Sequence, residues 1–142
     1  MNTKLSWAIF WALVVVFAVT AGVFLIPTFR ELITGFPFII ISGVVLFLLG
    51  VALVFLTVKE KVAGMLKKFL LLTGASPAGI IVSILLHNAV YGLFIYFFGA
   101  DFWNGGDEPF FFIMAIVVCP LGFLVGAVGS IVLAIRKSRM AN

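Results

Sequence analysis

Four long runs of apolar residues alternate with short polar connections along the chain. The runs cover residues 5–26, 38–58, 77–98 and 110–135, and none of them contains Asp, Glu, Lys or Arg. At about 1.5 Å per residue, each run forms a helix of roughly 30 Å or more, enough to cross the hydrocarbon core of a bilayer. The pattern therefore predicts an all-α polytopic membrane protein with four transmembrane helices in a single domain.

Proline and serine residues mark the expected ends of these helices. The first run ends before Pro27, and the second starts after Pro37. Ser76 is an expected N-cap for the third run, with Pro77 at the first helical position. The first run, preceded by Lys4, resembles a secretory signal, but its apolar stretch continues to Ile26, so we interpret it as a retained anchor.

Composition supports this membrane assignment. Of the 142 residues, 65% are hydrophobic and 10% are charged. Soluble domains average roughly 45–50% apolar residues and about 25% charged residues. The net charge of +4 does not indicate nucleic-acid binding, because the basic residues lie in short flanks beside the apolar runs. The single Cys119 excludes an internal disulfide and a thiolate metal cluster.

The basic residues predict the orientation of the chain. Eight of the nine, all except Arg30, flank the first run, follow the second or follow the fourth. The other two connections carry Arg30 together with most of the acidic residues, including Glu31 and Asp101. Cytoplasmic loops are enriched in Lys and Arg. We therefore expect a multi-pass protein of the cell membrane with both termini in the cytoplasm.

The segment KEKVAGMLKKFLLLTG, residues 59–74, carries apolar residues at helical spacing. We expect an amphipathic helix lying in the inner membrane interface, where basic side chains contact anionic lipid headgroups. The alternative is a basic hairpin formed by direct extension of the second and third spans. The expected headgroup contacts are Lys59, Lys61, Lys67 and Lys68.

The outer connection, residues 99–109, is acidic and runs into the aromatic start of the fourth span. Asp107 and Glu108 stand where a helix N-terminus favours negative charge, and Pro109 fits the first helical turn. We interpret both carboxylates as a helix cap. Cation or partner binding is the alternative interpretation.

The fourth span carries small residues along one helical face. Such faces allow two helix backbones to approach closely in lipid, so they indicate an interface without identifying the partner. Gly43 and Gly50 form a weaker face of this kind in the second span. Pro120 removes one backbone donor and is expected to distort the helix near Ile116. The predicted packing face comprises Ala115, Cys119, Gly122, Gly126, Gly129 and Ser130.

The third span carries a narrow polar stripe at its midpoint, near the expected bilayer centre. It consists of Ser83, His87, Asn88 and Tyr91. Lipid cannot satisfy these groups, so we expect the stripe to face the bundle interior or another protein. His87 is then either a neutral member of a hydrogen-bond network, a ligand or proton-handling group, or a single axial haem ligand.

The sequence contains no pattern typical of an enzyme, a metal site or a bound cofactor. The small multidrug exporters depend on a glutamate in their first span, and this first span has none. Dual-topology fluoride channels need balanced loop charges, and the strong bias in basic residues argues against such an inverted dimer. We therefore expect a non-enzymatic protein without a cofactor or metal.

Two segments, KKFLLLTGASPAGIIVSILLHNAVYGLF and GGDEPFFFIMAIVVCPLGFLVGAVGS, resemble parts of short prokaryotic four-span membrane proteins without an assigned function. The resemblance covers roughly the second half of the chain. It implies a four-helix membrane fold, but no chemistry and no functional residues.

The leading hypothesis is a small integral membrane protein that acts through helix–helix association. Its partners would be the lipid bilayer, other membrane subunits or copies of itself, packed through the small-residue face of the fourth span. One alternative is an oligomeric pore or carrier for a small solute, lined by the polar stripe. A second alternative is a subunit that contacts haem or quinone.

Overall fold

The computed structural model describes residues 3–29 and 36–141, and Arg30 and Glu31 lie outside these ranges. Its elements are α1 (Thr3–Leu25), α3 (Phe36–Lys59), α4 (Gly64–Phe98), the 3-10 helix η1 (Ala100–Trp103), α5 (Pro109–Ile113), the π-helical turn η2 (Met114–Val118) and α6 (Cys119–Ala141). Four helical stretches of the described chain are long and apolar enough to cross a membrane. The predicted all-α fold with four candidate spans is confirmed.

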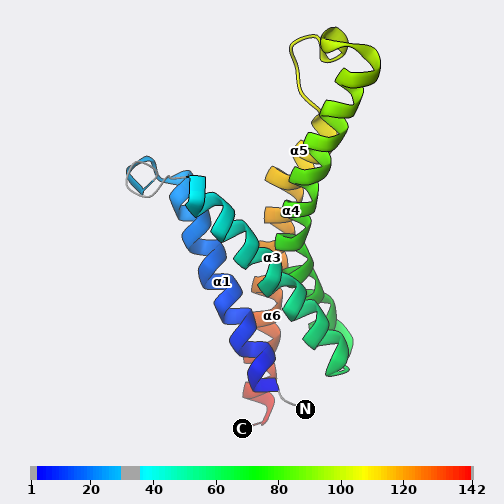
Figure 1. The fold of residues 1–142 in the computed structure, drawn as a ribbon. Helices are drawn as coiled ribbons and strands as arrows, with labels where there is room; N and C mark the ends of the chain where they lie inside the picture. Colours follow the sequence, from blue (N-terminus) through cyan, green and yellow to red (C-terminus); the bar gives the residue numbers. More distant parts are fainter. Residues whose placement is uncertain (1–2, 30–35, 142) are drawn as a thin grey trace.

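The helices form two hairpins that lie close together at one end of the molecule and diverge toward the opposite end. Figure 1 shows α1 beside α3, and α4 beside the nearly collinear α5, η2 and α6. The hairpins are close together near the chain termini and separate toward their other ends, where α4 and α5 extend past the α1–α3 pair (Figure 1). The shape is therefore an open V with one longer arm.

The apolar core lies in the half of the molecule where the hairpins meet. Phe10 and Leu53 are fully buried there, and the Phe17 ring of α1 stacks on the Phe123 ring of α6 with 3.9 Å between centroids. The buried core is drawn from all four long helices: Phe10, Leu13, Leu46, Leu53, Leu70, Phe123 and Ala127.

Two glycines bring α3 and α4 into backbone contact. A Cβ atom on Gly50 would lie 2.5 Å from the carbonyl oxygen of Gly74, and one on Gly74 would lie 2.7 Å from the carbonyl oxygen of Gly50. Real Cβ atoms do not approach other atoms so closely, so both positions require glycine. The weaker small-residue face of the second span thus packs within the chain.

The small-residue face of α6 packs against α4. A Cβ atom on Gly126 would meet the Thr73 backbone nitrogen at 2.7 Å, and one on Gly122 would meet the Ser76 hydroxyl at 2.8 Å. Farther along, the Phe69 ring covers Gly129. This face is therefore covered by the protein's own α4, and in this structure it is not an outer surface open to a partner.

The expected interfacial helix between the second and third spans is absent. Residues 64–74 are instead the first turns of α4, which continues through Ser76 and Pro77 to Phe98. The N-cap predicted at Ser76 is also wrong, because its hydroxyl donates to the Leu72 carbonyl at 2.8 Å inside the helix. The basic-hairpin alternative describes the structure better.

The apolar side of residues 59–74 finds protein instead of lipid, and this explains the difference. Leu70 is buried in the core, Val62 and Leu66 pack against that core, and Met65 is exposed. The ring of Pro77 is fully buried, and membrane helices accept proline where neighbouring groups compensate for the missing donor. Tertiary packing thus carries α4 straight through the predicted break.

The distortion expected near Pro120 is a π-helical turn. The Cys119 N–H bonds to the Met114 carbonyl, five residues back, and the turn includes Ile116. Ile116 is the residue whose carbonyl would accept from position 120 in a regular helix, and proline has no N–H to donate. The missing donor and the π-helical turn therefore coincide.

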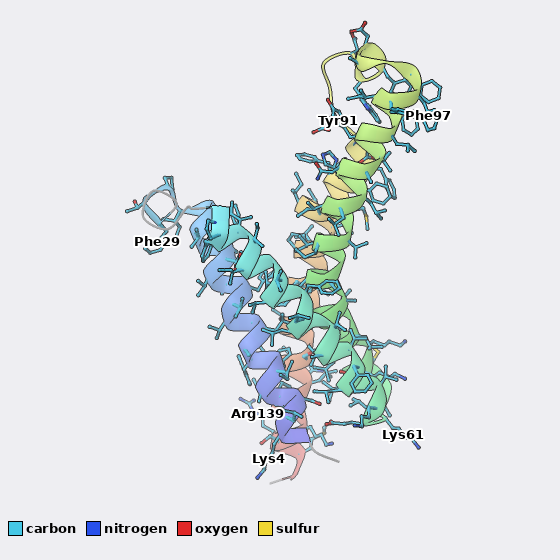
Figure 2. All side chains as sticks on the ribbon, viewed as in Figure 1. Lys4, Phe29, Lys61, Tyr91, Phe97 and Arg139 are labelled. Atoms are coloured by element: carbon cyan, nitrogen blue, oxygen red, sulfur yellow. The ribbon has the colours of Figure 1, made fainter. Side chains whose placement is uncertain are left out.

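The two ends of the molecule differ in charge. Figure 2 shows Lys4, Lys61 and Arg139 near one end, and Tyr91 and Phe97 toward the other. The turn from α4 to α5, at the end opposite Lys61, contains the acidic residues 101, 107 and 108. The described basic residues thus lie at one end of the molecule, and all described acidic residues except Glu60 lie toward the other.

The contact at Gly126 predicts a specific stability effect. Gly126→Ala should lower the free energy of unfolding by about 1–3 kcal/mol, because its methyl group would overlap the α4 backbone. Gly22→Ala is the matched control: nothing lies within 4 Å of its added Cβ, so the change should be neutral or stabilising by up to about 1 kcal/mol. Unfolding in micelles with rising dodecyl sulfate, followed by circular dichroism, measures both. Equal effects of the two substitutions would contradict the packing described here.

Candidate functional site

His87 links α4 to the start of α5. Its Nδ1 atom lies 3.1 Å from the Glu108 carbonyl oxygen and 3.3 Å from Glu108 Oε2. Its Nε2 atom lies 3.4 Å from Asp107 Oδ1. The imidazole is largely buried and the Asp107 side chain is half-exposed. We call His87, Asp107 and Glu108 the clasp, because these three residues join the two helices of the long hairpin.

Glu108 is also the N-cap of α5. Its carboxylate accepts from the backbone N–H groups of Phe110 at 2.8 Å and Phe111 at 2.9 Å, while Pro109 occupies the first turn. Burial alone would raise the pKa of Glu108, but the hydrogen bonds from Phe111, Phe110 and His87 hold that pKa below its ordinary value. The buried carboxylate is therefore stabilised in its charged form.

Asp107 contributes to the same turn from the other side. Its Oδ1 atom accepts from the Glu108 backbone N–H at 2.9 Å and faces the distal nitrogen of His87. The two carboxylates thus have different roles: Glu108 caps the helix, and Asp107 braces the residue that caps it.

The hydrogen bonds that His87 donates in the clasp depend on which of its ring nitrogens carry a proton. Neutral histidine has one N–H donor, whereas the imidazolium has two. Both ring nitrogens of His87 face carboxylate oxygens, so the protonated ring can donate to both partners. The carboxylates lie at opposite nitrogens of one ring, and no group of three His, Cys, Asp or Glu able to hold a metal ion occurs in the described chain. His87, Asp107 and Glu108 thus link α4 to the start of α5.

The structure does not bring the whole polar stripe together. Ser83 is buried, and the Tyr91 ring lies over that of His87 with 6.4 Å between centroids. Asn88 is exposed, and its amide donates to the Ile84 carbonyl at 2.8 Å within α4. Asn88 therefore satisfies a donor inside its own helix and takes no part in the clasp.

An aromatic cluster beyond the clasp was not identified from the sequence as one unit. Trp103 of η1 folds back on α4: its ring stacks on Tyr91 at 5.8 Å, and its Nε1 donates to the Tyr91 carbonyl at 3.3 Å. Phe94 and Phe102 complete the contact, with 4.9 Å between centroids. We call residues 91–103 the aromatic head. The sequence indicated an aromatic start of the fourth span after the outer connection, but not that η1 packs back on α4.

Pairing of His87 with Glu108 was also missed from the sequence. The two residues lie at similar distances from the turn after Phe98, on opposite sides of it. An antiparallel hairpin built around that turn brings them to the same level, so the signal was present. It was hidden by placing His87 at the centre of a shorter span.

The remaining predicted site residues lie between the clasp and the basic end of the molecule. The packing face of α6 meets α4, and a Cβ on Gly79 would touch Cys119 Sγ at 3.0 Å. Lys59 ends α3, with its ammonium 5.6 Å from the Phe55 ring centroid, and Lys61 follows in a turn with a φ of 51°. Lys67 and Lys68 lie near the start of α4. Headgroup contact by these lysines stays a prediction.

Neither a protein-family model, nor a curated protein, nor a solved structure matches this chain. Its class follows from composition and fold: it is a small integral membrane protein with four candidate membrane spans. Similarity to short prokaryotic membrane proteins stays a prediction.

The lowered pKa of Glu108 predicts an acid-sensitive hairpin end. Because the folded-state pKa lies below the ordinary value of about 4.3, the carboxylate stabilises the fold above that pH, and this contribution is lost as the pH falls toward the folded-state pKa. Trp103 fluorescence, measured in a Trp7→Phe, Trp11→Phe background, should change over that acidic range. Glu108→Gln should reduce the transition, since the titrating group is gone. An unaltered acid transition in Glu108→Gln would assign it to another group.

Proposed function

We propose that this protein is an accessory subunit that acts by associating with another integral membrane protein. The single observation that carries the proposal is the unequal reach of the two hairpins. From the crossing at Gly50 and Gly74, α3 continues outward to residue 36, whereas α4 continues to residue 98. The longer hairpin therefore extends roughly 15 Å beyond the shorter one.

At the basic end of the molecule, α3 and α4 reach the same level. Toward the basic end, α3 runs to Lys59 and α4 begins at Gly64. The excess length thus lies entirely on the acidic side. With the basic end in the cytoplasm, as the positive-inside rule favours, the aromatic head lies on the extracytoplasmic side.

One flat bilayer does not suit both hairpins. A hydrocarbon layer of about 30 Å that starts at Lys68 ends about twenty residues along α4, beside His87. The head then stands outside the hydrocarbon with Tyr96 and Phe97 exposed by 83% and 66%. A layer shifted outward to cover the head would instead immerse the outer end of α1 and α3. Contact with another protein resolves this conflict.

The arrangement supports association better than a solute pathway. His87 contacts Glu108 of its own hairpin, the Tyr91 ring lies over that of His87, and Asn88 bonds within its helix. A hollow of about 270 Å³ lies between α1 and α3, and its lining residues do not include the stripe: Val15, Val16, Val19, Thr20, Phe38, Ile41, Ser42 and Val45. A pore lined by the stripe would require opening the clasp.

Association can be tested on the intact protein in its own membrane. The protein, extracted into native-lipid nanodiscs from the source membrane, should have a mass by native mass spectrometry that exceeds one chain and includes a second polypeptide. The ratio of the two chains should stay constant across dilution. Protein expressed alone in a foreign membrane is the control, and it should lack the second polypeptide. A monomer without a partner in the source membrane would refute the proposal.

A further inference from the structure

We infer that the aromatic head is the docking surface, and that its partner is a different membrane protein presenting Lys or Arg side chains at its extracytoplasmic end. This inference rests on the association proposed above. It adds the location of the contact and the chemistry of the partner.

The head is organised before any partner arrives. Gly99, with a φ of 91°, turns the chain out of α4, and Asn104, with a φ of 48°, closes η1. Between them, Phe102 packs on Phe98 at 5.2 Å and on Trp103 at 5.0 Å. Rigid aromatic side chains lose little conformational entropy on binding, which makes them common anchors in protein interfaces.

The outer side of the head is the part left uncovered. Tyr96 and Phe97 are exposed by 83% and 66%. In Figure 2, Phe97 and Tyr91 lie on different sides of α4, with Tyr91 toward the loop that returns to α5. The internal contacts of the head thus use one side of the helix and leave the other side for a partner. Tyr96 and Phe97, whose ring centroids are 5.3 Å apart, therefore form an exposed aromatic pair on the arm that extends past the shorter hairpin.

Charge identifies the class of partner. The head and the turn that follows carry exposed Asp101 and half-exposed Asp107, and residues 69–135 contain no Lys or Arg. The basic groups of the described residues lie at the opposite end of the long hairpin, where Figure 2 labels Lys4, Lys61 and Arg139. A surface complementary to these carboxylates would present Lys or Arg side chains, which residues 69–135 of the long hairpin do not provide.

The same charges argue against two other occupants. A second copy in the same membrane orientation would bring Asp101 and Asp107 level with acidic groups of its own kind, and like charges across an interface are unfavourable. A surface of zwitterionic or anionic phospholipid gives no net positive charge to meet the carboxylates. A basic, chemically distinct protein satisfies both the aromatic and the acidic parts of the head.

The decisive experiment places a photoreactive amino acid at position 97 and, as the matched control, at position 55 in the source membrane. Phe55 is also strongly exposed, at 60%, but it lies on α3 in the basic half. The expected result is a cross-link from position 97 to a different membrane protein, in a peptide that contains Lys or Arg and lies outside that protein's membrane helices. Position 55 should give lipid adducts only.

Variants test the two components of the surface separately. Phe97→Ala should reduce the recovered partner about tenfold or more, as expected for an aromatic anchor, whereas Phe55→Ala should leave recovery within about twofold. Asp101→Lys should reduce recovery more than Asp101→Asn, and the difference should shrink at high salt. Helical circular dichroism and Trp103 fluorescence verify that each variant is folded.

The remaining outcomes separate the two proposals. Cross-links from position 97 only to a second copy, or only to lipid, would overturn the inference about the head. Full partner recovery in Phe97→Ala combined with Asp101→Lys would also overturn it, while leaving association intact. Absence of any partner with the unaltered chain would refute association itself.

Discussion

Backbone contact between Gly50 and Gly74 sets the level at which the two hairpins cross, and the rest of the geometry depends on that level. Lipid does not drive apolar helices together as water does, so membrane helices rely on close packing. A side chain at either glycine would collide with the opposite carbonyl oxygen. Since the crossing aligns the basic ends of α3 and α4, all the extra length of α4 appears at the acidic end. The exposed head is a direct consequence.

The two halves of the long hairpin are held by different interactions. In the basic half, α4 packs on α6 through Gly122 and Gly126, and both helices contact the core shared with α1 and α3. Beyond the end of α3, the hairpin lacks these neighbours. There, charged and hydrogen-bonded groups join α4 to α5, through His87 and Glu108.

Much of this fold was accessible from the sequence, but its registers were not. Uncharged runs predicted four spans, and small residues predicted the face of α6 that packs. Periodicity could not show whether residues 59–74 would meet lipid or protein. Leu70 and Met65 are both apolar residues of this segment, but only Leu70 is buried. That choice moved the start of the third span from Pro77 to Gly64. His87 consequently lies in the outer third of α4 and not at its centre. Its pairing with Glu108 depends on the tertiary register of the hairpin, which local sequence does not determine.

The clasp also has a mechanical role that follows from the position of the π-helical turn. Met114–Val118 interrupts the regular hydrogen bonding between α5 and α6, at the point where Pro120 removes a donor. A helix bends most readily at such a turn. Below the turn, Cys119 is fixed against Gly79, and above it Glu108 is fixed to His87. The irregular turn is thus bracketed by one contact on each side, both made to the continuous helix α4. This bracketing allows α5 to follow α4 out to the aromatic head despite the break in its own hydrogen bonding, and it makes the orientation of the head depend on the integrity of the clasp.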